Sequence, residues 1–294
     1  RTMPEYVCRL CPRQCGALRT EEKGEGFCGM PALPVIARAG LHHWEEPCIS
    51  GARGAGTVFF SGCVLGCVYC QNGPISRERF GRAVSAERLR EIFEELVAQG
   101  AHNIDLVSPT PYVPAILEAL EEPLPVPVVW NTGGYERVET LRRLKGKVQV
   151  WLPDMKYADS ALAAKYSGAA DYFETASAAI REMVRQTGNY VMEDGLLKRG
   201  VLIRHLLLPG ALENTKRVLD WAAETFRPGQ VLFSLMAQYT PQPGAEGLLA
   251  RRVTGAEYRA ALAYMENLGI ADGYCQERTS ARAEYTPDFD LTGV

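Results

Sequence analysis

The chain has 294 residues, of which 47% are hydrophobic, a size and composition typical of a globular enzyme with a large core. Its net charge is −3 and no run of lysine and arginine stands out, which argues against nucleic acid or an anionic membrane surface as the main partner. No apolar stretch of about 18 residues occurs, so no membrane span is predicted, and the first residues lack the apolar segment of a signal peptide.

The cysteine content sets this chain apart from an ordinary enzyme. Seven of the nine cysteines fall into two groups, at positions 8, 11, 15 and 28 and at positions 63, 67 and 70. Secreted disulfide-rich domains are usually short and carry an even number of cysteines, whereas this chain is long and has an odd number. We therefore expect reduced, metal-binding cysteines and a cytoplasmic protein. The remaining two, Cys48 and Cys275, are expected to be buried thiols.

Residues 1–50 are rich in Cys, Gly and Pro and show no sustained helical or strand period, which predicts a small metal-stapled extension. In residues 51–294, short apolar segments alternate with segments whose apolar residues recur at helical spacing, which predicts the main domain. In chain order the segments are strand 57–60, helix 86–99, strand 104–107, helix 112–120, strand 126–130, helix 136–144, strand 148–152, helix 159–186, strand 201–208, helix 212–225, strand 231–235 and helix 254–268.

This alternation predicts an α/β fold with a parallel sheet and right-handed helical crossovers. Six strand–helix units favour a partial (β/α)6 barrel over a closed barrel of eight. Ligands of such folds bind at the carboxyl ends of the strands, so the polar residues that follow each strand form the candidate site.

A C-x3-C-x2-C motif, made by Cys63, Cys67 and Cys70, follows the first predicted strand. Three thiolates this close can ligate one iron–sulfur cubane, and soft sulfur ligands select iron–sulfur or zinc. Three ligands leave one iron of a four-iron cluster open, which indicates catalysis rather than a closed structural site. The alternatives are a zinc-binding loop or three unrelated core cysteines.

The motif, with the aromatic Tyr69 before its third cysteine, resembles the signature of the radical S-adenosylmethionine (SAM) superfamily. Residues 59–63 (FFSGC) and 71–72 (QN) resemble more specifically the branch typified by pyruvate formate-lyase activating enzyme. Residues 45–51 (EEPCISG), with the N-terminal cysteines, resemble an uncharacterised offshoot of that branch. The resemblance implies a [4Fe–4S] cluster, SAM as a cofactor, and a 5′-deoxyadenosyl radical that abstracts a hydrogen atom.

The same resemblance implies which residues contact SAM. Tyr69 corresponds to an aromatic residue near the adenine, and Asn131 to an aspartate that touches SAM. The Gly-Gly-Glu-like segment that usually holds the SAM amino group has no carboxylate here, and the hydroxyls of Ser108 and Thr110 would take its place.

Asp154 and Lys156 resemble an Asp-x-Lys pattern in which the lysine would meet the SAM carboxylate; the alternative is a partly buried ion pair. His205 and Gln238 are further candidate contacts to SAM, Gln238 to the ribose. A lone histidine among apolar residues is more often a hydrogen-bonded core residue, and Arg204 takes the opposite face of the same strand, so one of the two points into the barrel.

The first four cysteines, Cys8, Cys11, Cys15 and Cys28, lie in a segment with no core of its own. Four ligands close a metal site, so this second metal centre is expected to be structural or electron-relaying. The spacing suits zinc and a [4Fe–4S] cluster equally. Residues 42–43 (HH) can approach the mouth of the active site, although a surface loop is the more ordinary interpretation.

The branch resemblance implies a peptide or protein substrate, such as the glycine of a glycyl-radical enzyme, and a one-electron donor such as flavodoxin or ferredoxin. The altered segment 107–111 and the added cysteines favour instead a radical SAM enzyme that modifies a small molecule or a ribosomal peptide. A non-catalytic iron–sulfur or zinc-binding protein is a third alternative, against which the candidate SAM residues argue.

Overall fold

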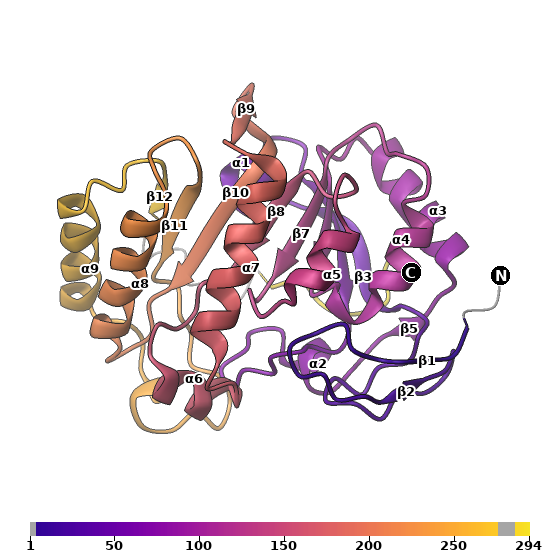
Figure 1. Cartoon of the computed structure of the whole chain (residues 1–294), viewed down its shortest axis with the longest axis horizontal. Coiled ribbons are helices and arrows are strands. Elements are labelled where there is room, and N and C mark those ends of the chain that lie inside the picture. The colour runs from indigo at the N-terminus through magenta and orange to yellow at the C-terminus, as the bar shows by residue number, and fades with distance from the viewer. Residues whose placement is uncertain (1–3, 276–285) are drawn as a thin grey trace.

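A large mixed sheet dominates the computed structural model, which describes residues 4–275 and 286–294 (Figure 1). Its strand order is β12-β11-β10-β8-β7-β6-β4-β3-β5, and β9 pairs with β10. The strands are β3 (Val35–His42), β4 (Ala55–Phe60), β5 (Arg82–Ala83), β6 (Ile104–Val107), β7 (Val128–Thr132), β8 (Val150–Pro153), β9 (Val191–Glu193), β10 (Leu196–Leu206), β11 (Leu232–Met236) and β12 (Gly273–Cys275).

The neighbouring strands β4, β6, β7, β8, β10, β11 and β12 are parallel, whereas β3 and β5 are antiparallel additions at one edge and β9 pairs antiparallel with β10. Helices connect the strands along the chain. They are α1 (Pro47–Ser50), α2 (Gly73–Ser76), α3 (Ala86–Ala98), α4 (Val113–Ala119), α5 (Val138–Arg143), α6 (Ser160–Ser167), α7 (Tyr172–Thr187), α8 (Leu212–Thr225) and α9 (Gly255–Asn267), with 3-10 turns at Thr110–Tyr112 and Gly247–Ala250. The expected α/β fold with a partial barrel is confirmed, because the sheet curves without joining its two edges.

The helices follow local sequence signals. Ser85 caps α3 by accepting a hydrogen bond from the Arg88 backbone, and Thr254 forms a capping box with Glu257 at the start of α9. The predicted helix 159–186 is two helices in the structure. Gly168 ends α6 in the left-handed region at φ 57°, a conformation that glycine adopts at little cost.

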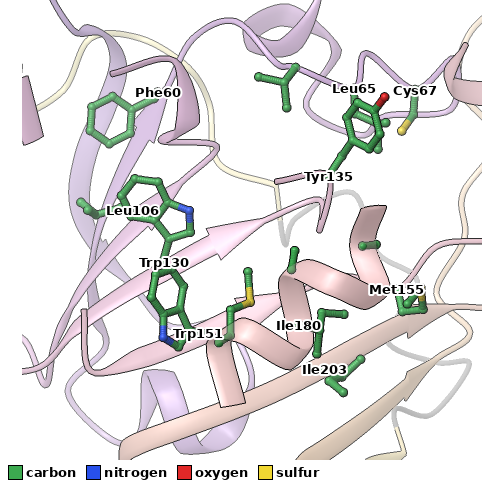
Figure 2. Packing of buried hydrophobic residues seen from close by; sticks show 14 of the residues in the cluster. Phe60, Leu65, Cys67, Leu106, Trp130, Tyr135, Trp151, Met155, Ile180 and Ile203 are labelled. Carbon is green, nitrogen blue, oxygen red and sulfur yellow. The ribbon is translucent and has the colours of Figure 1, made fainter. Parts of the chain in front are cut away.

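The outward face of the sheet packs against the helices and forms the main core. Figure 2 shows Trp130 and Trp151 from neighbouring strands side by side, with ring centroids 6.2 Å apart, and Ile180 of α7 beside Ile203 of β10. None of the described helices is long and apolar enough to cross a membrane.

The inward face has an apolar layer that α1 closes. Cys48 and Ile49 are fully buried against Val129, Leu152 and Leu202 inside the sheet. In Figure 1, α1 lies at one end of the barrel and α2 at the other. The interior is therefore filled at the amino ends of the strands, and open space is left at their carboxyl ends.

The N-terminal cysteine segment is smaller than predicted. β1 (Tyr6–Val7) and β2 (Leu18–Arg19) pair as a separate two-stranded sheet, but β3 belongs to the main sheet and α1 to the barrel interior. Residues 35–50 therefore pack as part of the barrel. β3 was not predicted from the sequence, because alanine and glycine occupy much of it and such small residues give a weak strand signal.

Candidate functional site

A cavity of about 450 Å³ opens at the carboxyl ends of the parallel strands, where the sequence predicted a site. Residues from many separate segments meet there, because parallel strands end at one edge of the sheet. The candidate residues that line it are Cys63, Cys67, Tyr69, Cys70, Ser108, Asn131, Asp154, Lys156 and Gln238. The structure thus brings together nearly all of the expected residues around one space.

The three cysteines come from the segment after β4, residues 61–72, which we call the cluster loop. Burial, with smaller contributions from the nearby Cys67 and Cys70, raises the pKa of the free Cys63 thiol to about 12. Burial also raises the pKa of Cys67, while the Lys156 ammonium opposes this effect. Three neighbouring thiolates in a partly buried site require positive charge, which a bound metal supplies.

This donor set fits an iron–sulfur cluster, since soft thiolates on one loop face a cavity where a fourth ligand can bind. In residues 4–275 and 286–294, no group of three or more His, Cys, Asp or Glu side chains is already arranged to hold a metal ion. The fit therefore rests on the chemistry of the thiols and on the cavity that they share.

A buried ionic network forms the floor of the cavity. The Arg204 guanidinium donates to Glu45 Oε1 (2.8 Å), Asp154 Oδ1 (2.9 Å) and Asn131 Oδ1 (2.7 Å). Asn131 Nδ2 in turn donates to Glu45 Oε2 at 2.9 Å, and Lys156 Nζ bonds Asp154 Oδ2. Burial acts to raise the pKa of Asp154, but Arg204 and Lys156 together hold it below its usual value. The floor thus keeps its charges paired while Lys156 still faces the cavity.

A second polar layer lies just below this network. Asp105 on β6 is fully buried and accepts a hydrogen bond from Thr57 Oγ1 at 3.3 Å. Burial, together with the nearby Glu45 carboxylate, raises the pKa of Asp105 to about 8. Ser234 on β11 donates to Glu46 Oε1 at 2.8 Å. The interior therefore holds a carboxyl group that is largely protonated at neutral pH.

His205 lies outside the cavity, contrary to its prediction as a SAM contact. Its Nδ1 lies 2.6 Å from the Met155 carbonyl and its Nε2 2.8 Å from Thr215 Oγ1, and the ring is fully buried. Burial lowers the pKa of His205 to about 4, so the ring is neutral. Strand alternation places Arg204, its neighbour, on the inner face instead. The alternative role as a hydrogen-bonded core residue matches this environment.

Ser108 and Thr110 have different surroundings, although they were predicted to act together. Ser108 lines the cavity with φ 56°, in the left-handed region that is uncommon for serine. Thr110 is 2% exposed, does not line the cavity, and donates to Glu136 Oε1 at 2.5 Å. Glu136 also accepts from Thr132 Oγ1 (2.6 Å), and burial raises its pKa. The Glu136 carboxyl, from the segment after β7, thus lies behind segment 107–111, where the carboxylate of the Gly-Gly-Glu-like pattern is missing.

Sequence reasoning missed the acidic residues that reach the site from outside the strand ends. Glu45 and Glu46 lie between β3 and α1, and the cavity is also lined by His42, His43 and Trp44 of the same segment. The two histidines therefore lie at the cavity rather than on a remote surface loop. The sequence signal that could have found these carboxylates is segment 45–51, which resembles an offshoot of the activating-enzyme branch and contains both Glu45 and Glu46.

The N-terminal cysteines lie near one another in space. Burial raises the pKa of Cys11 to about 12, and the nearby Cys28 and Cys8 add to the shift. Cys15 also acts on the pKa of Cys28, which burial raises. A Cβ at Gly26 would lie 2.6 Å from Cys15 Sγ. Of the two single cysteines, Cys48 is buried as expected, but Cys275 is exposed.

Comparisons with known proteins show the family of this chain. The sequence profile of the radical SAM superfamily matches residues 57–222, more than half of the chain. An uncharacterized protein from Methanocaldococcus jannaschii is 28% identical over 275 residues, which cover 90% of this chain and 75% of that protein.

Among solved structures, SuiB from Streptococcus suis shares the fold with a TM-score of 0.53 and 14% identity, over 76% of this chain and 47% of SuiB. SuiB bound to its precursor peptide SuiA aligns with a TM-score of 0.51 and 14% identity, over 73% of this chain and 46% of SuiB. This chain thus spans about half the length of SuiB. With its profile match and its three cavity-lining cysteines, the chain belongs to the radical SAM superfamily, whose enzymes use a [4Fe–4S] cluster and SAM.

Proposed function

We propose that this enzyme cleaves SAM reductively and uses the 5′-deoxyadenosyl radical to abstract hydrogen from a peptide or protein, such as the glycine of a glycyl-radical enzyme. The observation that carries the proposal is the single cavity that joins Cys63, Cys67 and Cys70 to Tyr69 and Lys156. Those three thiolates would hold the [4Fe–4S] cluster, which supplies the electron when it is bound.

The remaining side chains of the cavity suit SAM. The Lys156 ammonium can donate a charge-assisted hydrogen bond to the carboxylate of SAM. The Tyr69 ring is fixed by edge contacts to Tyr157, Tyr166 and Tyr239, with centroids 6.0 to 6.5 Å apart, and so offers a rigid surface to the adenine. Their part in this proposal is to bind and orient SAM and to exclude water from the site.

The size of the cavity favours a substrate that enters it as a narrow group. A cavity of about 450 Å³ lies in the lower half of the range of roughly 300–1,000 Å³ found for single small-molecule sites. SAM would take most of it, so the substrate must reach in as a narrow group such as one residue of a peptide. The exposed Trp44 at the cavity offers an aromatic contact for such a chain. SuiB, which shares the fold, has been solved with a precursor peptide.

The test compares two substrate pools from the organism that makes this protein, grown in deuterated medium. The reconstituted, dithionite-reduced enzyme is mixed with SAM and either the dialysed macromolecular fraction or the small-molecule filtrate. Mass spectrometry then measures deuterium in 5′-deoxyadenosine. A peptide or protein substrate predicts deuterium transfer from the macromolecules alone. Transfer from the filtrate alone would replace our proposal with a small-molecule substrate, and the Cys67→Ala enzyme is the control for both pools.

We also propose that Cys8, Cys11, Cys15 and Cys28 bind a second metal centre, as zinc or as a [4Fe–4S] cluster. Their mutual proximity and the lack of a large core in this segment support it. Replacing Cys8 and Cys11 together with alanine should release this metal and leave the absorbance of the other cluster. Metal analysis of the wild type that finds four irons and no zinc would contradict the second centre.

A flavodoxin or ferredoxin in a reducing cytoplasm is the electron source that we propose for the reaction. The one-electron chemistry of the cluster and the metal-binding role proposed for seven of the cysteines support it. The wild-type enzyme should turn over with a reduced flavodoxin in place of dithionite, and a failure with both flavodoxin and ferredoxin would reject this part.

A further inference from the structure

The turn between α6 and α7 touches the cluster loop directly. Ser167, the last residue of α6, is 4% exposed, and its hydroxyl donates to Cys67 Sγ at 3.0 Å. The Val68 backbone N–H donates to the Tyr166 carbonyl at 2.9 Å, which ties the same turn to the loop a second time. Cys67 therefore has a hydrogen-bond donor in a place from which water is excluded.

The Ser167 hydroxyl is itself held by a buried phenol. The Tyr157 hydroxyl lies 2.8 Å from Ser167 Oγ, and either atom of this pair can donate. When Ser167 gives its proton to the sulfur, Tyr157 can donate to the serine oxygen. The Tyr157 hydroxyl also lies 2.8 Å from the Tyr69 hydroxyl at the cavity, and its one proton is donated either to Ser167 or to Tyr69. The hydroxyl of Ser167 is thus oriented rather than free to rotate.

Arg13, from the N-terminal cysteine segment, fixes the distance between the turn and the cluster loop. Its guanidinium donates to the carbonyls of Ser167 (2.8 Å) and Gly168 (2.5 Å) on the turn. It also donates to the carbonyls of Val64 (3.0 Å) and Leu65 (3.3 Å) on the loop. Only a guanidinium has enough donors in a planar fork to serve four carbonyls at once.

We propose that Ser167 is a positioning residue that raises the reduction potential of the cluster at Cys63, Cys67 and Cys70, and that Arg13 holds it in place. This inference rests on the proposed function, since it needs that cluster. The step is a one-electron reduction in which the cluster gains the electron, the donor is oxidised, and no bond breaks. The added electron increases the negative charge on the ligating sulfurs, so a donated hydrogen bond stabilises the reduced state more than the oxidised one.

The experiment is a redox titration of the reconstituted, SAM-free enzyme, with dithionite as reductant and the electron paramagnetic resonance signal of the reduced cluster as readout. Ser167→Ala should shift the reduction equilibrium about tenfold toward the oxidised state, which is about 59 mV for one electron. Ser167→Thr, which keeps the hydroxyl, should restore the wild-type potential. Arg13→Gln should shift it in the same direction as Ser167→Ala, by less.

The matched control is Ser177→Ala on α7, because the Ser177 hydroxyl is buried with no hydrogen-bond partner among the described residues. Its potential should equal that of the wild type. An unchanged potential in a Ser167→Ala enzyme that carries the cluster would overturn this inference and leave the proposed function standing. If that variant does not retain the cluster, Ser167→Cys takes its place, because a thiol is a weaker donor than the hydroxyl, and an unchanged potential there overturns the inference equally. A wild type that binds no four-iron cluster overturns both.

Discussion

Replacing Arg204 should destabilise the protein more than breaking an exposed ion pair would. Its side chain is 13% exposed and pairs with two carboxylates that are 15% and 14% exposed, those of Glu45 and Asp154. Arg204→Leu leaves both carboxylates buried without this partner, and breaking a buried pair in this way costs about 3–5 kcal/mol. Domains near this size lose roughly 2–4 °C of Tm for each kcal/mol, so we expect a fall of about 6 °C or more.

The assay is thermal unfolding of the anaerobically purified enzyme, followed by circular dichroism at several pH values. Arg204 and Lys156 lower the pKa of Asp154, so losing Arg204 raises that pKa in the folded state. The folded variant therefore binds more protons than the folded wild type in the acidic range where Asp154 titrates, and the stability lost relative to wild type should grow as pH rises through that range.

Arg88→Leu is the matched control, because Arg88 also bridges two carboxylates, but on the exposed face of α3. It should cost less than about 1 kcal/mol. Equal losses of Tm in the two variants would refute the argument that the floor of the cavity is a buried network.

Three further predictions concern single residues of the barrel. Because the pKa of Asp105 is raised to about 8, the free energy of unfolding of the wild type should fall as the pH rises from about 4 to about 8. Asp105→Asn should flatten that pH dependence in urea unfolding, and an unaltered pH profile would contradict a buried protonated carboxyl. His205→Ala should lower Tm, since it removes contacts to Met155 and Thr215, but leave the Kd for SAM unchanged in calorimetry. A higher Kd would show that His205 contributes to SAM binding. Lys156→Ala should weaken SAM binding about ten- to a hundredfold, because a charge-assisted hydrogen bond contributes about 1.5–3 kcal/mol; a lower Tm with an unchanged Kd would reduce Lys156 to a structural partner of Asp154.

The sequence could predict the parts of the site that follow strands. The spacing of Cys63, Cys67 and Cys70 and the alternation of strands and helices are local signals, and the carboxyl-end rule converts them into a location. Asn131 and Lys156 reach the cavity for the same reason. Their predicted contacts with SAM remain predictions for the variants above.

The rest depends on contacts that a local pattern does not contain. Glu45 meets Arg204 across 159 residues of sequence, and Ser167 meets Cys67 across 100. Strand alternation requires that one of Arg204 and His205 points inward, but only the register of β10 against its neighbouring strands decides which one. α1 was not predicted, because its four residues are too few to form a stable helix by themselves. They form a buried helix only where they pack against the strands at the closed end of the barrel.

The measurement that tests the central claim most directly is SAM cleavage by the anaerobically reconstituted enzyme. With dithionite as reductant, the wild type should release 5′-deoxyadenosine and methionine, detected by liquid chromatography and mass spectrometry. The Cys63→Ala, Cys67→Ala and Cys70→Ala enzymes should release neither, while Cys275→Ala, which changes an exposed cysteine outside the cluster loop, should act as the wild type does. Full activity in any one of the three cluster-loop variants would show that the cluster is not held by these three thiolates.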